Sequence, residues 1–86
     1  MNILYKDFII ELSTFINGSQ CFQVIGNYKN SKYNSFNGFI KQNNNKYTLH
    51  TYLHHKKCNS IFIDEYTFKS FDECTNWIKH HIDVLI

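Results

Sequence analysis

Histidine and cysteine side chains gather in the middle of the chain. His50, His54, His55 and Cys58 lie within nine residues of one another, and zinc prefers these ligand types. His50 and His54 would share one face of an extended strand but lie about 13 Å apart along it, too far to hold one ion. His54 or His55 could meet Cys58 in a turn, but a structural zinc site needs four ligands. A small zinc-binding protein is therefore a weaker alternative, and we predict no metal site.

Three arrangements could be catalytic. Cys58 and His54 could serve as nucleophile and base, and Cys74, near the start of a helix, could have a lowered thiol pKa. The sequence offers neither of these an orienting group or an oxyanion site. His50 and His54 with Lys56 could supply the acid and base of a small ribonuclease, but exposed polar residues on a strand explain these side chains better. We therefore expect a protein that is not an enzyme and that uses no cofactor.

Lysines and tyrosines gather near two loops, and this mixture suits single-stranded RNA or DNA because cations meet phosphates and rings stack on bases. The residues concerned are Lys29, Lys32 and Tyr33 near the first loop and Tyr52, His54, Lys56 and Lys57 around the second. However, the chain has no arginine, and its net charge is only +2. Arginine is the usual bidentate contact to phosphate and guanine. Nucleic-acid binding is therefore the second hypothesis.

A protein partner is the leading hypothesis. A sheet face that bears tyrosine and histidine offers contact area at low entropy cost. An edge strand such as residues 21–28 or 61–68 could also pair with a partner's sheet or with a second copy, giving a homodimer. We predict a small protein-binding module, an inhibitor or accessory protein of phage or mobile-element type that acts on a host protein. The candidate partner-binding residues are His50, Tyr52, His54, Lys56, Lys57, Lys29, Lys32 and Tyr33.

Composition and length limit the architecture that positions these side chains. The chain has 86 residues, which predicts one domain spanning residues 1–86. Phe, Ile, Tyr, Lys and Asn make up 45 of the 86 residues, a bias typical of AT-rich codons. No apolar run approaches the roughly 18 residues of a membrane span, and the charged N-terminal segment is unlike a signal peptide. The three cysteines form no CxxC pair, so we expect free thiols in the cytoplasm of the producing or infected cell.

The two ends of the chain read as helices. Apolar residues recur at helical spacing within residues 2–17, and Gly18 would supply the stop. A capping box from Ser70 to Glu73 predicts that a helix begins at Ser70, with the serine accepting from the Glu73 amide and the glutamate reaching back to the amide of the capping residue. The apolar face of this last helix consists of Phe71, Cys74, Trp77, Ile78, Ile82 and Leu85.

The middle of the chain alternates as strands do. We predict strands at residues 21–28, 36–42, 46–54 and 61–68, a turn at residues 43–45, and a bulge or twist near Asp64 and Glu65. In the third strand, Leu49 and Leu53 share the face that meets the helices. The opposite face carries His50, Tyr52 and His54 and stays open to solvent or to a ligand.

The expected fold class is α+β: an N-terminal helix, a four-stranded antiparallel meander and a C-terminal helix, with both helices on one sheet face. The expected core residues are Phe8, Leu12, Phe15, Leu49, Leu53, Phe71, Trp77 and Ile78.

Overall fold

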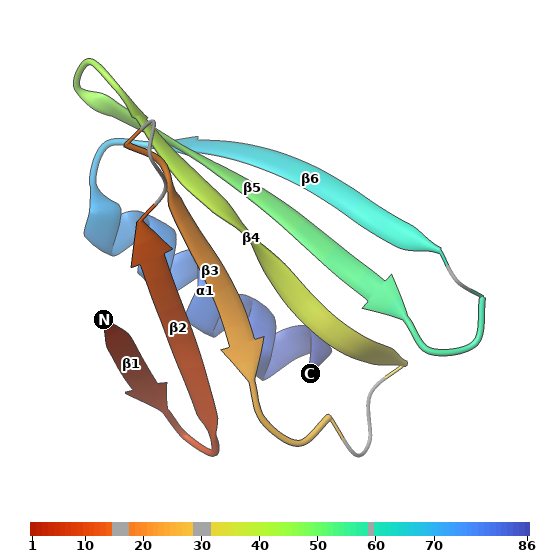
Figure 1. Cartoon of the computed structure of the whole chain (residues 1–86). Helices are drawn as coiled ribbons and strands as arrows, with labels where there is room; N and C mark the ends of the chain where they lie inside the picture. Colours follow the sequence, from red (N-terminus) through yellow and green to blue (C-terminus); the bar gives the residue numbers. More distant parts are fainter. Residues whose placement is uncertain (15–17, 29–31, 59) are drawn as a thin grey trace.

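A computed structural model describes residues 1–14, 18–28, 32–58 and 60–86. Six β-strands follow one another along these residues, and one α-helix follows the strands (Figure 1). The elements are β1 (Asn2–Tyr5), β2 (Phe8–Thr14), β3 (Gln20–Ile25), β4 (Tyr33–Asn43), β5 (Lys46–His55), β6 (Ile61–Phe68) and α1 (Phe71–Leu85). The expectation of a four-stranded sheet between two helices is therefore wrong.

The strands form one antiparallel sheet in which each strand pairs with the next, in the order β1 to β6. The predicted turn between the second and third expected strands is confirmed as the β4–β5 turn, where Asn44 has a left-handed φ of 56°. Of the bulge or twist predicted in the last strand, the bulge is wrong, because β6 pairs with β5 in unbroken register from Ile61 to Phe68. The register shifts instead in β4, between Tyr33 and Ser35.

A hairpin, β1 with β2, stands where the N-terminal helix was expected. The chain reverses at Lys6, which has a left-handed φ of 53°. With that reversal, Ile3 and Tyr5 of β1 and Ile10 and Leu12 of β2 recur with the period of two that the core side of a strand requires. Three isoleucines in this segment favour strands because their branched side chains are stiff. The helical spacing of apolar residues in this segment therefore does not indicate a helix.

Two further N-terminal expectations change with this hairpin. Gly18 does not end a helix but lies between β2 and β3 with a φ of 83°, a backbone angle that glycine adopts easily. Phe15, expected in the core, lies outside the described residues. The strand expected at residues 21–28 is shorter, as β3, and it lies inside the sheet between β2 and β4 rather than at an edge.

The capping box predicted at the start of the last helix is largely confirmed. The Ser70 hydroxyl accepts a hydrogen bond from the Glu73 backbone N–H over 3.2 Å. The Glu73 carboxylate accepts from the Lys69 N–H over 2.9 Å, one residue before the amide that the capping box predicts. The bond to Ser70 satisfies an amide that the first turn of a helix leaves free, and the bond from Lys69 fixes the residue before the cap, so α1 begins where the sequence places it.

Helix α1 packs on one face of the sheet, where the core lies (Figure 1). The buried apolar residues are Ile10, Leu12, Phe22, Val24, Tyr28, Phe36, Ile40, Leu49, Leu53, Cys74, Ile78 and Ile82. Four residues predicted for the core are among them, whereas Phe8, Phe71 and Trp77 are half-buried and pack against this cluster. Trp77 contacts Tyr66 edge-on, with ring centroids 5.0 Å apart, and so joins α1 to β6.

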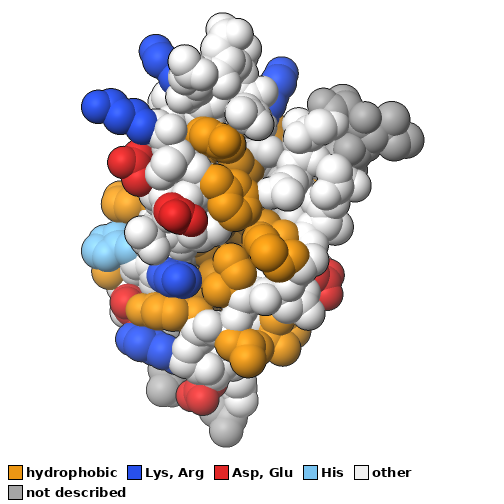
Figure 2. Space-filling view, turned by 90° about the vertical axis from the view of Figure 1, so that its left-hand side faces the viewer, with side chains coloured by type: hydrophobic (Ala, Val, Ile, Leu, Met, Phe, Trp, Pro, Cys, Tyr) orange, Lys and Arg blue, Asp and Glu red, His pale blue; other side chains and the backbone are white. Residues whose placement is uncertain are grey.

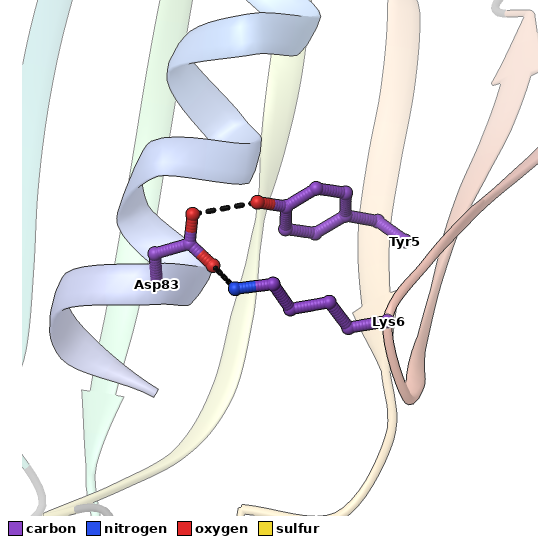
Figure 3. Close-up of polar contacts among 3 residues, drawn as sticks. All are labelled: Tyr5, Lys6 and Asp83. Carbon is purple, nitrogen blue, oxygen red and sulfur yellow. Dashed lines mark hydrogen bonds and ion pairs between the residues drawn. The ribbon is translucent and has the colours of Figure 1, made fainter.

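On the β1 side of the molecule, the first hairpin contacts α1. Figure 2 shows hydrophobic side chains gathered in a band down the middle of this side. The Tyr5 hydroxyl and the Lys6 ammonium both reach the Asp83 carboxylate on α1 (Figure 3). These contacts join the first hairpin to the last turns of the helix. In the described ranges, no helix is long and apolar enough to cross a membrane.

Candidate functional site

The sheet surface opposite α1 is the candidate site, and we call it the open face. Side chains alternate along each strand, so the buried residues of β2 to β5 identify the core side and the residues between them identify the open face. Along β1 to β6 the open face carries Asn2, Leu4, Ile9, Glu11, Ser13, Cys21, Gln23, Ile25, Ser35, Asn37, Phe39, Lys41, Asn43, Lys46, Thr48, His50, Tyr52, His54, Ile61, Ile63, Glu65 and Thr67.

Aromatic rings stack at the centre of the open face. Phe39 on β4 and His50 on β5 are direct cross-strand partners, and their rings lie nearly parallel with centroids 4.3 Å apart. Tyr52 is the next open-face residue of β5, and its ring centroid lies 6.3 Å from that of Phe39. The strand register therefore holds three rings together and presents them on the surface.

Aliphatic side chains flank this centre on both sides. Leu4, Ile9 and Ile25 form one row across β1, β2 and β3, because each is paired with the next. Leu4 is 78% exposed and Ile25 is 42% exposed. On the other side, Ile63 is paired with Tyr52 and is 65% exposed. Exposed apolar side chains on one face mark a surface that can bury area against another molecule.

Charge on the open face is low and mixed. Its acidic residues are Glu11 and Glu65, and its lysines are Lys41 and Lys46. Glu65 lies across from His50, with Oε2 at 3.6 Å from the histidine Nδ1. Such a surface lacks the basic character that a polyanion requires.

The predicted site residues fall into separate groups. His50, Tyr52 and His54 lie on the open face, as predicted. Lys32, Lys56 and Lys57 lie instead around the loops at one end of the sheet, about 20 Å along β5 from His50. The structure therefore separates the lysines from the stacked rings of Phe39 and His50, and of the predicted residues on the open face only His54 lies near them, two residues before Lys56.

The lysines at the sheet end have structural contacts of their own. Lys56 Nζ donates to the Tyr28 carbonyl over 2.9 Å, and the Lys56 N–H donates to the Lys32 carbonyl over 2.8 Å. The Lys57 N–H donates to His55 Nδ1 over 3.1 Å. Lys56 thus ties the two loops together at this end. Lys29 lies outside the described residues.

Tyr33 belongs to the core side of this end rather than to the open face. Its ring meets His55 edge-on at 5.8 Å and Phe62 edge-on at 6.1 Å. It forms part of an aromatic chain beside the lysines, and this separates it from Tyr52.

The described residues offer little for metal or thiol chemistry. They contain no group of three or more His, Cys, Asp or Glu side chains that could hold a metal ion. The possibility that the Cys74 thiol has a lowered pKa is contradicted. Burial, followed by the charge of neighbouring Glu73, raises the pKa of Cys74 to about 11, so the helix N-terminus does not activate this thiol.

Several open-face residues were missed from sequence, above all Phe39, Ile25 and Leu4. Phe39 alternates in phase with the polar residues Asn37 and Lys41, so its position on the polar side of a strand was the available signal. Leu4 was assigned to a helix, which concealed its alternation. A comparison with protein-family models, with curated proteins and with solved structures finds no match for this chain.

Proposed function

We propose that this protein is a non-enzymatic protein-binding module and that its open face receives a partner protein. The observation that carries the proposal is the stacked pair of Phe39 and His50 beside Tyr52, at the centre of a sheet face that α1 leaves uncovered. Aromatic residues at the centre of a patch are typical of binding hot spots, because they bury a large area at a small entropy cost.

The surroundings of the three rings support a protein rather than a polyanion as the partner. Gln23 and Asn37 lie beside the rings and can exchange hydrogen bonds with a partner's polar groups. Two glutamates and two lysines leave the face without the net positive charge that phosphate binding needs. The narrower expectation, an inhibitor or accessory protein that blocks a host protein, remains a prediction within this proposal.

Site-specific photo-cross-linking tests the face directly. A photoreactive amino acid replaces Ile25 on the open face in one variant and Asn76 on the exposed side of α1 in the matched control. Both variants are irradiated in the producing cells and examined by denaturing electrophoresis and mass spectrometry. We expect discrete adducts with another protein from position 25 and none from position 76.

Three outcomes would contradict the proposal. Equal adduct patterns from both positions would show that the open face has no special role. Adducts with nucleic acid at position 25 would favour the second hypothesis. An adduct of two copies of this chain would identify a homodimer in place of a different partner.

Variants of Tyr52 test whether its ring is part of the hot spot. Tyr52→Ala should abolish the adduct from position 25, whereas Tyr52→Phe should keep it because the ring remains.

Nucleic-acid binding is the second candidate, and one observation favours it. Lys32 and Lys57 are exposed beside the aromatic chain of Tyr33, His55 and Phe62, a combination of cations and rings that suits single strands. Fluorescence anisotropy with labelled single-stranded RNA tests it. Binding that weakens steeply with salt and is lost in Lys57→Ala would support this candidate, and salt-independent binding would remove it.

A further inference from the structure

The two edge strands of the sheet, β1 and β6, differ in length and in their contacts with α1. β1 has four residues, and its neighbouring turn is held by Asp83 on α1. β6 has eight residues and forms the other end of the strand order, with β5 as its partner. Figure 1 shows β6 along the outer border of the sheet. A strand of this length presents a row of backbone groups to whatever lies beyond it.

The register identifies which backbone groups point outward from β6. The His55 N–H donates to the Ser60 carbonyl over 3.0 Å, so residues 55 and 60 form a hydrogen-bonded pair of the antiparallel ladder. The ladder continues without a shift, and such pairs alternate with non-bonded ones. The N–H and C=O groups of the alternate residues therefore point away from β5. These residues are Ile61, Ile63, Glu65 and Thr67.

Charge on this edge argues against a second copy as the occupant. In antiparallel self-pairing, outward-bonding residues must face one another. The two registers with the greatest overlap then place Asp64 opposite its own copy, or Glu65 opposite its own copy. Like charges directly opposite each other destabilise a strand pair. Acidic side chains on an edge strand commonly prevent self-pairing in this way.

We propose that the outer edge of β6 accepts an extended segment of another polypeptide in antiparallel pairing. This segment has two consecutive basic residues opposite Glu65 and Asp64, followed by apolar residues opposite Ile63 and Phe62. Both acids are exposed, and they point to opposite faces of the sheet, so two adjacent basic residues meet one acid each. Ile63 and Phe62 are exposed in the same alternating way and offer apolar surface to the next two residues.

This inference rests on the proposed protein-binding function and specifies its partner: the partner's segment lies beside Ile63 and Glu65, which belong to the open face. Backbone hydrogen bonds along the edge would supply affinity, and the two acids would supply the choice of sequence.

A defined peptide tests the edge without the natural partner. The probe is a blocked synthetic peptide in which two lysines are followed by three valines, and the control peptide has glutamates in place of the lysines. Amide hydrogen exchange of the intact protein is followed by NMR with and without peptide. With the lysine peptide, we expect the amides of Ile61, Ile63 and Glu65, which the five peptide residues cover, to exchange about tenfold more slowly. No protection at these amides would overturn the proposal.

Two sets of variants separate the backbone contribution from the charge contribution. Ile63→Pro removes an outward N–H but leaves the ladder to β5 intact, and Ile63→Ala keeps that N–H. Proline should abolish peptide binding, whereas alanine should retain it. If the proline variant fails to fold, the double variant Asp64→Lys with Glu65→Lys still decides, since both positions are exposed. It should bind the lysine peptide about tenfold more weakly and prefer the glutamate peptide.

The edge and the proposed function can fail independently. Loss of peptide binding in the charge-reversed variant, together with cross-linking from position 25, supports both. Cross-linking from position 25 with no peptide protection overturns only the edge. Peptide protection without any cross-linking from position 25 overturns the open face as a partner site. Unchanged binding of the lysine peptide after charge reversal overturns the chemistry assigned to the edge.

Discussion

The Tyr5 hydroxyl donates a hydrogen bond of 2.6 Å to Asp83 Oδ2, across 78 positions of sequence. Lys6 forms an ion pair with the other oxygen of the same carboxylate. The hydrogen bond from Lys6, followed by that from Tyr5, lowers the pKa of Asp83 from its ordinary value of 3.8. Because the charged carboxylate accepts both contacts, the junction between the first hairpin and α1 depends on pH.

We predict that Asp83→Asn lowers the melting temperature and loosens the β1–β2 hairpin. A carboxylate with a lowered folded-state pKa contributes stability that is present above its unfolded value and is lost as pH falls through the folded value. The difference between wild type and variant should therefore be constant from about pH 5 to 9 and shrink below about pH 4. Thermal unfolding followed by circular dichroism across this range measures it.

Glu11→Gln is the matched control, since it removes an exposed carboxylate on the other face of the same hairpin. Its melting temperature should stay close to that of wild type at neutral pH. A loss in Asp83→Asn that persists unchanged at pH 3 would assign the effect to something other than this junction.

The parts of the fold predicted from sequence are those with local signals. Strict alternation located β5, and the hydroxyl and carboxylate of Ser70 and Glu73 located the start of α1. Apolar residues within 2–17 recur at helical spacing, and the same segment also contains core-side residues two positions apart, such as Ile10 and Leu12. The choice between a helix and a strand depends on pairing with β3, a contact that no local pattern contains. A reversal at Lys6 offers no glycine or proline signal.

In the candidate site, too, the residues with local signals were predicted and those that depend on contacts between strands were not. His50 and Tyr52 were placed on the correct face because the parity of a strand is local. Phe39 could not be added to them, since its contact with His50 depends on the register between β4 and β5. The lysines were grouped with the rings because they are near them in the sequence. Proximity in the sequence does not reveal the hydrogen bond that Lys56 donates to the Tyr28 carbonyl.

We predict that Gly38→Ala severely destabilises the sheet. A Cβ atom at Gly38 would lie 1.8 Å from the His50 carbonyl oxygen and 2.7 Å from Phe22 Cε1. A backbone atom cannot move aside cheaply, so the loss should reach about 4 kcal/mol or more. Chemical denaturation measures it.

Gly18→Ala provides the contrast for this prediction. A Cβ atom at Gly18 meets nothing within 4 Å, but the φ of 83° is strained for alanine. This variant should lose about 1–2 kcal/mol and still fold. Equal losses at the two glycines would contradict the close approach between β4 and β5.

We predict that Ile78→Ala costs about 2–4 kcal/mol of unfolding free energy, because this side chain is 0% exposed in the core between α1 and the sheet. Val84→Ala on the same helix should change stability by less than about 0.5 kcal/mol, since Val84 is 63% exposed. Urea denaturation of both variants makes the comparison. Similar losses at the two positions would mean that α1 packs on the sheet with a different face.

The three thiols should react with a chromogenic disulfide reagent in the order of their exposure. Cys58 is exposed, Cys21 is half-buried on the open face, and Cys74 is buried. Since burial raises the pKa of Cys74 to about 11, about one Cys74 side chain in a thousand is a thiolate at pH 8. Cys74 should therefore react only as fast as the protein unfolds, and Cys58→Ser should remove the fastest phase. If Cys74→Ala removed that phase instead, the helix would not cover the core as described.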